Sequence, residues 1–176
     1  HFNLANIVTF FNISCGIFAI YFLTHDEFMG AALFAWLAGA FDIFDGKIAR
    51  KYNLSTEFGI QLDSYADFLS FVIVPAMFIY FAIFDGKESF YNMALIAFVF
   101  IYYVISGLRR LIQFNINANE GEVEKYFTGI PTPLGAILLW VVYLIYLTDY
   151  VNEYFVLGSI IIIGYLLNSK IKIKHL

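Results

Sequence analysis

The sequence predicts an all-α integral membrane protein with six transmembrane helices. Of its 176 residues, 61% are hydrophobic and 20% are aromatic, and the mean hydropathy is +0.77. Soluble domains are about 45–50% apolar. A chain of this size could not enclose so much apolar surface in one core, because the buried fraction rises only slowly with length. Lipid therefore has to cover part of the surface.

Each predicted span is an apolar stretch between polar breaks. A helix needs about 20 apolar residues to cross the hydrocarbon core, and turn formers and charges mark the breaks. The first stretch lacks a basic leader, so we expect a retained helix rather than a signal peptide. No repeat or linker divides the chain, which predicts a single domain over residues 1–176. The expected helices cover residues 4–23, 28–50, 58–84, 90–114, 131–147 and 151–168.

The basic residues predict the orientation of these helices. In a six-helix arrangement, nine of the ten Lys and Arg residues fall on one side, and Lys87 falls on the other. Because Lys and Arg concentrate in cytoplasmic loops, we expect both termini in the cytoplasm and the protein in the cell membrane. The nine residues are Lys47, Arg50, Lys51, Arg109, Arg110, Lys125, Lys170, Lys172 and Lys174.

Four aspartates interrupt the second and third apolar stretches, at the end expected to face the cytoplasm. Asp42 and Asp45 are three residues apart, and Asp63 and Asp67 are four apart, so each pair shares one face of its helix. A short link makes the two helices antiparallel neighbours, and four carboxylates can then converge. Each carboxylate at the centre of a membrane helix costs about 2.5–3.5 kcal/mol. Positive charge therefore has to lie among them.

Two sources of that charge are open. One is a salt-bridge network with Lys47, Arg50 and Lys51, which leaves the same-face spacing unexplained. The other is a site for hard divalent cations, which prefer oxygen ligands, and four acids suffice for two ions. Gly46 and Gly59 lie on the acidic face and would let a ligand approach the backbone, although helix packing also explains glycines in membrane helices.

The residues around the aspartates form a recognisable pattern. It reads Asp-x2-Asp-Gly-x2-Ala-Arg-x8-Gly-x3-Asp-x3-Asp from Asp42 to Asp67 and resembles the motif of the CDP-alcohol phosphotransferase family at every defined position. The resemblance implies an enzyme in which an alcohol attacks the phosphate of a CDP-linked donor and releases CMP. It also implies that Asp42, Asp45 and Asp63 bind Mg²⁺ or Mn²⁺, as two ions, with Asp67 completing the metal site and acting as general base.

The same resemblance assigns a pocket for the nucleotide and the lipid donor, and it implies a homodimer. No Ser-His-Asp set, P-loop or cysteine nucleophile is visible in the sequence, so we expect direct in-line displacement without a covalent intermediate. No nucleic acid is expected as a partner. The residues implied for the donor pocket are Gly46, Ala49, Arg50, Gly59, Thr9 and Asn12.

Three further stretches resemble the phosphatidylserine synthases of this family. They read NIVTFFNISCG at residues 6–16, SGLRRLIQFN at 106–115 and FTGIPTPLGA at 127–136. They imply L-serine as the acceptor and a CDP-diacylglycerol-type lipid as the donor. Ala5 replaces the usual Pro, and Gln113 stands where a second Arg is usual. The acceptor contacts implied are Arg110, Gln113, Thr128 and Gly129.

Alternatives remain open at this stage. Arg110 is also explained as a positive-inside anchor, Gly129 as part of a helix start, and Thr9 and Asn12 as interhelical hydrogen bonders. Glycerol 3-phosphate or an inositol phosphate could replace serine as the acceptor. Intramembrane carboxylates also line the ion paths of divalent-cation transporters, but here the acids stop at the cytoplasmic half. A family member without catalytic activity is the remaining alternative, but every defined position of the motif is present in this sequence.

Overall fold

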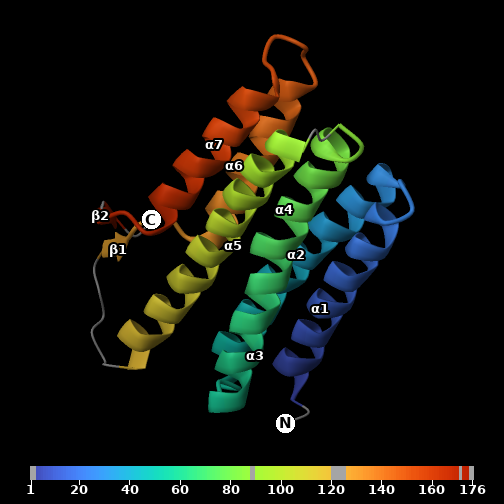
Figure 1. The fold of residues 1–176 in the computed structure, drawn as a ribbon. Coiled ribbons are helices and arrows are strands. Elements are labelled where there is room, and N and C mark those ends of the chain that lie inside the picture. The colour runs from blue at the N-terminus through green and yellow to red at the C-terminus, as the bar shows by residue number, and fades with distance from the viewer. Residues whose placement is uncertain (1–2, 88–89, 120–125, 171, 175–176) are drawn as a thin grey trace. The chain divides into compact units, whose positions relative to one another are not determined.

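The computed structural model describes residues 3–87, 90–119, 126–170 and 172–174. Helices make up most of the described chain, as predicted, and they belong to two compact units, His1–Ala82 and Ile83–Leu176 (Figure 1). All six predicted helical segments are present, with ends within about five residues of the expected ones. The two units are described separately below.

The first unit consists of three long helical segments. Asn3 and Thr56 cap the first and third by accepting the backbone N–H groups of Asn6 and Gly59, which satisfies donors that a helix start leaves unpaired. Asn53 ends the second segment in the left-handed conformation (φ 51°), which Asn adopts more readily than most residues. The elements are α1 (Leu4–Leu23), α2 (Phe28–Tyr52), α3 (Glu57–Asp67), η1 (Phe68–Ile73), α4 (Val74–Ile79) and η2 (Tyr80–Phe84).

The third segment is not the regular helix that the sequence predicted. Its turns widen to the π-helix η1, where the Val74 N–H donates to the carbonyl of Leu69, five residues back. Pro75 follows at once, and proline has no N–H and crowds the carbonyl four residues before it. Single π-turns within α-helices often occur at functional sites, and this one begins directly after Asp67.

Helix α1 packs along α2 and the third segment through a face of small and polar residues. Asn6, Thr9 and Asn12 are all buried on this face, although each carries a polar side chain. A Cβ atom on Gly16 would lie 2.9 Å from Leu69 Cδ2, so the glycine lets α1 approach η1 closely. The buried polar face of α1 therefore lies against the elements that carry the aspartates.

The described residues of the second unit form three helices and a small antiparallel sheet that the sequence did not predict. In the sheet Phe127 pairs with Ile173; three-residue strands are too short to show the alternation that identifies a strand in a sequence. Helix packing in this unit buries Tyr103, Leu139 and Ile160. The elements are α5 (Phe90–Asn119), β1 (Tyr126–Thr128), α6 (Thr132–Tyr146), α7 (Glu153–Leu167) and β2 (Lys172–Lys174).

Among the described residues, four helical segments are long and apolar enough to cross a membrane. Large apolar side chains such as Met29 (75% exposed) and Phe98 (69% exposed) cover their outer surfaces, where lipid would surround them. The protein is therefore a multi-pass membrane protein. Helices α6 and α7 have 15 residues each, about 22 Å at 1.5 Å per residue, so the count of six spans stays a prediction. The four helices are Leu4–Leu23, Phe28–Tyr52, Glu57–Phe84 and Asn92–Asn117.

Candidate active site

Three of the four motif aspartates come together in the first unit. Asp42 on α2 and both Asp63 and Asp67 on α3 each offer one carboxylate oxygen, and these oxygens lie within 4.8 Å of one another. The side chain of Asp63 is exposed, whereas Asp42 and Asp67 are partly buried. The spacing of three and four residues thus places acids from two helices around one point, as the sequence predicted for these three.

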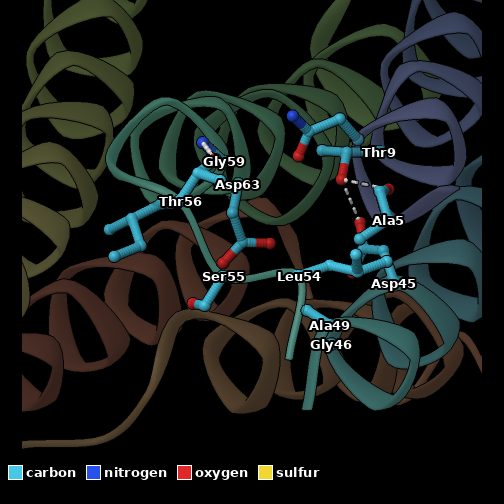
Figure 2. Close-up of a pocket in the computed structure, with 12 residues that line it drawn as sticks. Ala5, Thr9, Asp45, Gly46, Ala49, Leu54, Ser55, Thr56, Gly59 and Asp63 are labelled. Carbon is cyan, nitrogen blue, oxygen red and sulfur yellow. Dashed lines mark hydrogen bonds between the residues drawn. The ribbon is translucent and has the colours of Figure 1, made fainter. Parts of the chain in front are cut away.

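Asp45 lies beside this group rather than in it. It is 3% exposed, and its Oδ2 accepts a hydrogen bond of 2.7 Å from the Thr9 hydroxyl on α1 (Figure 2). The same hydroxyl lies 3.1 Å from the carbonyl oxygen of Ala5. Because a hydroxyl has one proton to donate, the shorter contact to the charged oxygen is the stronger one. Within the described residues, Asp45 Oδ1 is buried with no hydrogen-bond partner.

The nearby cations form no close ion pairs with these acids among the described residues. Over the described part of the chain, none of the four aspartates forms an ion pair with Lys47, Arg50 or Lys51. The salt-bridge alternative is therefore not supported. Three converging carboxylates and an unpaired buried oxygen on Asp45 form an oxygen-only donor set, which fits a hard divalent cation. Asp42, Asp63 and Asp67 are the residues that would hold it.

A pocket of about 90 Å³ opens beside the carboxylates. Gly46 and Ala49 of α2 and Gly59 of α3 line it together with Asp45 and Asp63 (Figure 2). Of the six residues expected to bind the donor nucleotide, four line this pocket: Thr9, Gly46, Ala49 and Gly59. The other two, Arg50 and Asn12, do not line it. The pocket lies between α2, α3 and the turn that joins them, and Thr9 of α1 lines another side.

The two glycines of the pocket have different neighbours. A Cβ on Gly46 would make an ordinary contact with the Arg50 guanidinium, whose Nη1 would lie 3.6 Å away. The exposed Arg50 side chain therefore lies along the same face of α2 as Gly46. A Cβ on Gly59 would come within 2.9 Å of Asn6 Oδ1, so Asn6 already packs against the glycine.

Two lining features were not predicted as site residues. Asn6 is buried and lines the pocket, and the Leu54–Thr56 turn forms another wall. Asn3 connects them, because its Oδ1 accepts from the Asn6 N–H and its Nδ2 donates to the Leu54 carbonyl at 3.1 Å. The spacing of three between Asn6, Thr9 and Asn12 is a signal that could have identified Asn6.

Asn12 is not at the pocket. It lies in the core of the first unit, where its Oδ1 accepts a hydrogen bond of 2.5 Å from the Ser70 hydroxyl.

The residues expected to bind the acceptor lie in the second unit. Arg110 is 5% exposed, and its Nε donates to the Ile130 carbonyl at 3.1 Å. Gly129 has φ 83°, and a Cβ there would lie 2.5 Å from the Leu167 carbonyl oxygen, so the backbone itself requires glycine. Gln113 is exposed and donates to Asn117. Thr128 belongs to β1, and its side chain lies outside the described residues.

A family model for CDP-alcohol phosphatidyltransferases matches residues 2–167. The chain belongs to this family. Similar members include the CDP-diacylglycerol–serine O-phosphatidyltransferase of Bacillus subtilis, 31% identical over 96% of this chain and 88% of that protein. The Methanocaldococcus jannaschii enzyme of the same name is 33% identical, with 96% and 72% covered. The archaetidylserine synthase of Methanothermobacter thermautotrophicus is 30% identical, with 96% and 68% covered.

Proposed function

We propose that this CDP-alcohol phosphatidyltransferase transfers the phosphatidyl group, or its ether-lipid equivalent, from a CDP-diacylglycerol-type lipid to L-serine. The products are a phosphatidylserine-type lipid and CMP. The observation that carries the chemistry is the convergence of three carboxylates beside a glycine-lined pocket. Serine as the acceptor is supported by the relatives, which are named for serine transfer, and by the three stretches that resemble phosphatidylserine synthases.

The aspartates would hold the cofactor of this reaction. Asp42, Asp63 and Asp67 would bind Mg²⁺ or Mn²⁺, and Asp45, oriented by Thr9, would complete a site for two ions. When bound, such ions neutralise the diphosphate and the charge on the departing CMP. Arg50, which lies along the Gly46 face, is our candidate for pairing with a phosphate oxygen.

The transfer itself is a single in-line displacement. The serine hydroxyl oxygen forms a bond to the phosphorus that carries the lipid, and the bond from that phosphorus to the CMP oxygen breaks. CMP leaves with the electron pair, and the hydroxyl proton passes to Oδ2 of Asp67, because Oδ1 of this residue is buried away from solvent. Gly46 and Gly59 line the pocket in which the nucleotide would lie beside the reacting phosphate.

The finer points of placement belong to the same proposal. We propose six spans in the cell membrane, with both termini and the aspartates on the cytoplasmic side, a single domain over residues 1–176 and a homodimer. The distribution of Lys and Arg supports the orientation. Arg110, a buried guanidinium, is the candidate for the serine carboxylate.

The test is CMP release by the purified protein with CDP-diacylglycerol and Mg²⁺ or Mn²⁺. L-serine, glycerol 3-phosphate and an inositol phosphate are supplied in turn, and an ether-linked donor is run in parallel. We expect release that depends on L-serine. Release with another acceptor alone would keep the chemistry and overturn serine, whereas no release with either donor would contradict the proposal and favour the transporter.

Replacing Gly46 by Ala is expected to weaken donor binding without weakening the fold. The added methyl meets no close protein neighbour, and Ala is favoured over Gly in a helix by about 1 kcal/mol. The methyl projects into the pocket instead, so the KM for CDP-diacylglycerol should rise by roughly tenfold or more, equivalent to about 1.4 kcal/mol of lost binding. Steady-state kinetics and a melting curve measure the two effects.

Gly158→Ala is the matched control for this substitution. A Cβ at Gly158 meets nothing within 4 Å, so this substitution is also free of steric conflict, but the residue lies on α7 in the second unit. It should leave the donor KM unchanged. Equal KM values for the wild-type protein and Gly46→Ala would show that the nucleotide does not enter this pocket.

Replacing Thr9 by Val is expected to weaken metal binding. Valine keeps the shape of threonine but removes the hydroxyl that donates to Asp45 Oδ2. Loss of such an orienting hydrogen bond typically costs about 10–100-fold in metal affinity or activity. Titration of Mn²⁺ by electron paramagnetic resonance measures the affinity. Thr9→Ser retains the hydroxyl and should bind Mn²⁺ like the wild type; equal loss in both variants would assign the effect to packing.

A further inference from the structure

Asn12 lies about one helical turn from the carboxylate site along each of two segments, α1 and the third segment. On α1 it follows Thr9 by three residues, and Thr9 contacts Asp45. On the third segment its partner Ser70 follows Asp67 by three residues. Residues three apart lie within one turn of each other, both on α1 and where α3 passes into the wider η1. Asn12 therefore lies about one turn from the aspartate group, on the side where α1 covers it.

Both polar atoms of the Asn12 amide are buried, but only Oδ1 forms a hydrogen bond among the described residues. The side chain is 0% exposed, and Oδ1 accepts from the Ser70 hydroxyl. Among the described residues, Nδ2 has no hydrogen-bond partner. A buried donor without a partner costs free energy that leucine at this position would not incur, so packing alone does not explain an asparagine here.

A buried acceptor that also lacks a hydrogen-bond partner among the described residues lies on the third segment, three residues before Ser70. Oδ1 of Asp67 is buried and has no hydrogen-bond partner in the described part of the protein. The Asn12 amide therefore supplies a donor where the Asp67 carboxylate lacks one. A hydrogen bond between them, direct or through one ordered water, would satisfy both buried atoms.

The local backbone fixes which end of the amide is available. Ser70 belongs to η1, the wide turn directly after Asp67, and Gly16 lets α1 approach this turn closely. Because the Ser70 hydroxyl donates to Oδ1 of Asn12, the other end of the planar amide has to present its N–H groups. The π-turn, Gly16 and Ser70 together hold Asn12 as a donor.

We propose that Asn12 is a positioning residue for Asp67: Ser70 anchors its Oδ1, and its Nδ2 donates to Oδ1 of Asp67. This contact keeps Oδ2 of Asp67 turned toward the other carboxylates, where it serves as metal ligand and base. The inference rests on the proposed function in assigning these two roles to Asp67. Asn12 itself touches neither substrate nor metal, in contrast to the donor-binding role that the sequence suggested for it.

The test compares Asn12→Leu, Ser70→Ala and the double variant with the wild type. Leucine has the same number of side-chain heavy atoms as asparagine and the same branch at Cγ, and Ser70→Ala removes a single oxygen. Ser14→Ala is the matched control, because Ser14 is exposed on α1 and bonds to the Phe10 carbonyl of its own helix. Mn²⁺ affinity is measured without substrate by electron paramagnetic resonance, and kcat and KM are measured with CDP-diacylglycerol and L-serine.

We expect Asn12→Leu to raise the Mn²⁺ Kd and lower kcat, each by about 10–100-fold, the range found for residues that orient metal ligands. Both KM values should change by less than about twofold, because Asn12 does not touch a substrate. Ser70→Ala should show a smaller loss of the same kind, and the double variant should lose no more than Asn12→Leu, since the two side chains act as one unit.

Two results would overturn the positioning role of Asn12. A lower melting temperature with unchanged Mn²⁺ Kd and kcat would make Asn12 a packing residue and overturn the inference, as would additive losses in the double variant. If Asn12→Leu does not fold, the same readouts on Ser70→Ala decide. If the wild type releases no CMP, the proposed function fails, and the Mn²⁺ titrations still test the role of Asn12.

Discussion

Replacing Asp67 by Asn is expected to lower serine-dependent CMP release by roughly 10²–10⁴-fold, the contribution of a positioned general base. The amide has the shape of the carboxylate but cannot accept the proton of the serine hydroxyl. It also removes one of the three charges that meet within 4.8 Å, so metal binding should weaken as well. The rate of CMP release under saturating Mg²⁺ separates the two effects, because excess metal restores occupancy but not the base.

Glu57→Gln is the matched control for Asp67→Asn. It makes the same change from carboxylate to amide on the same helix, but Glu57 is exposed in the first turn of α3, outside the aspartate group. This variant should keep nearly full activity. If Asp67→Asn retained more than about a tenth of the wild-type rate under saturating metal, the role of Asp67 as general base would be wrong.

Removal of divalent metal is expected to abolish CMP release, and either Mg²⁺ or Mn²⁺ should restore it. Three carboxylates from α2 and α3 converge without an ion pair to Lys47, Arg50 or Lys51 among the described residues. Without a bound cation the three carboxylates repel one another, and the diphosphate would add further negative charge to the site. A chelator such as EDTA, followed by graded return of each metal, measures the dependence.

The same cation should also stabilise the fold. A ligand that binds only the folded state at 100 times its Kd adds about 2.7 kcal/mol to the free energy of unfolding, so metal should raise the melting temperature in the absence of substrate. Asp42→Asn should require more metal for both effects. Full activity in excess chelator, or a melting curve that ignores Mg²⁺ and Mn²⁺, would contradict a metal site at these aspartates.

Much of the fold and of the acidic group could be predicted because both depend on local patterns. The helices follow from apolar runs between polar breaks, and the meeting of Asp42, Asp63 and Asp67 follows from spacings of three and four on neighbouring helices. The expectation of a bound cation follows from the cost of burying such charges, and the expected chemistry follows from the motif that surrounds them. Each of these inferences needs only the residues within a few turns of the chain.

The features that the sequence did not reveal depend on contacts between distant segments. Asp45 is set apart because Thr9, 36 residues away, binds it, and Asn6 joins the pocket because α1 packs on Gly59. Asn12 contacts Ser70 rather than the pocket because of the wide turn before Pro75. Helical periodicity identifies the face on which a side chain lies, but not the residue of another helix that it meets.

The most direct test of the proposed reaction is the incorporation of radiolabelled L-serine into lipid. Purified protein is incubated with CDP-diacylglycerol, Mn²⁺ and labelled serine, and both organic-extractable label and released CMP are counted. Direct displacement predicts one lipid-bound serine for each CMP, with Asp67→Asn lowering both products together by roughly 10²–10⁴-fold. CMP release without labelled lipid would mean hydrolysis or a different acceptor, and it would contradict serine transfer by this site.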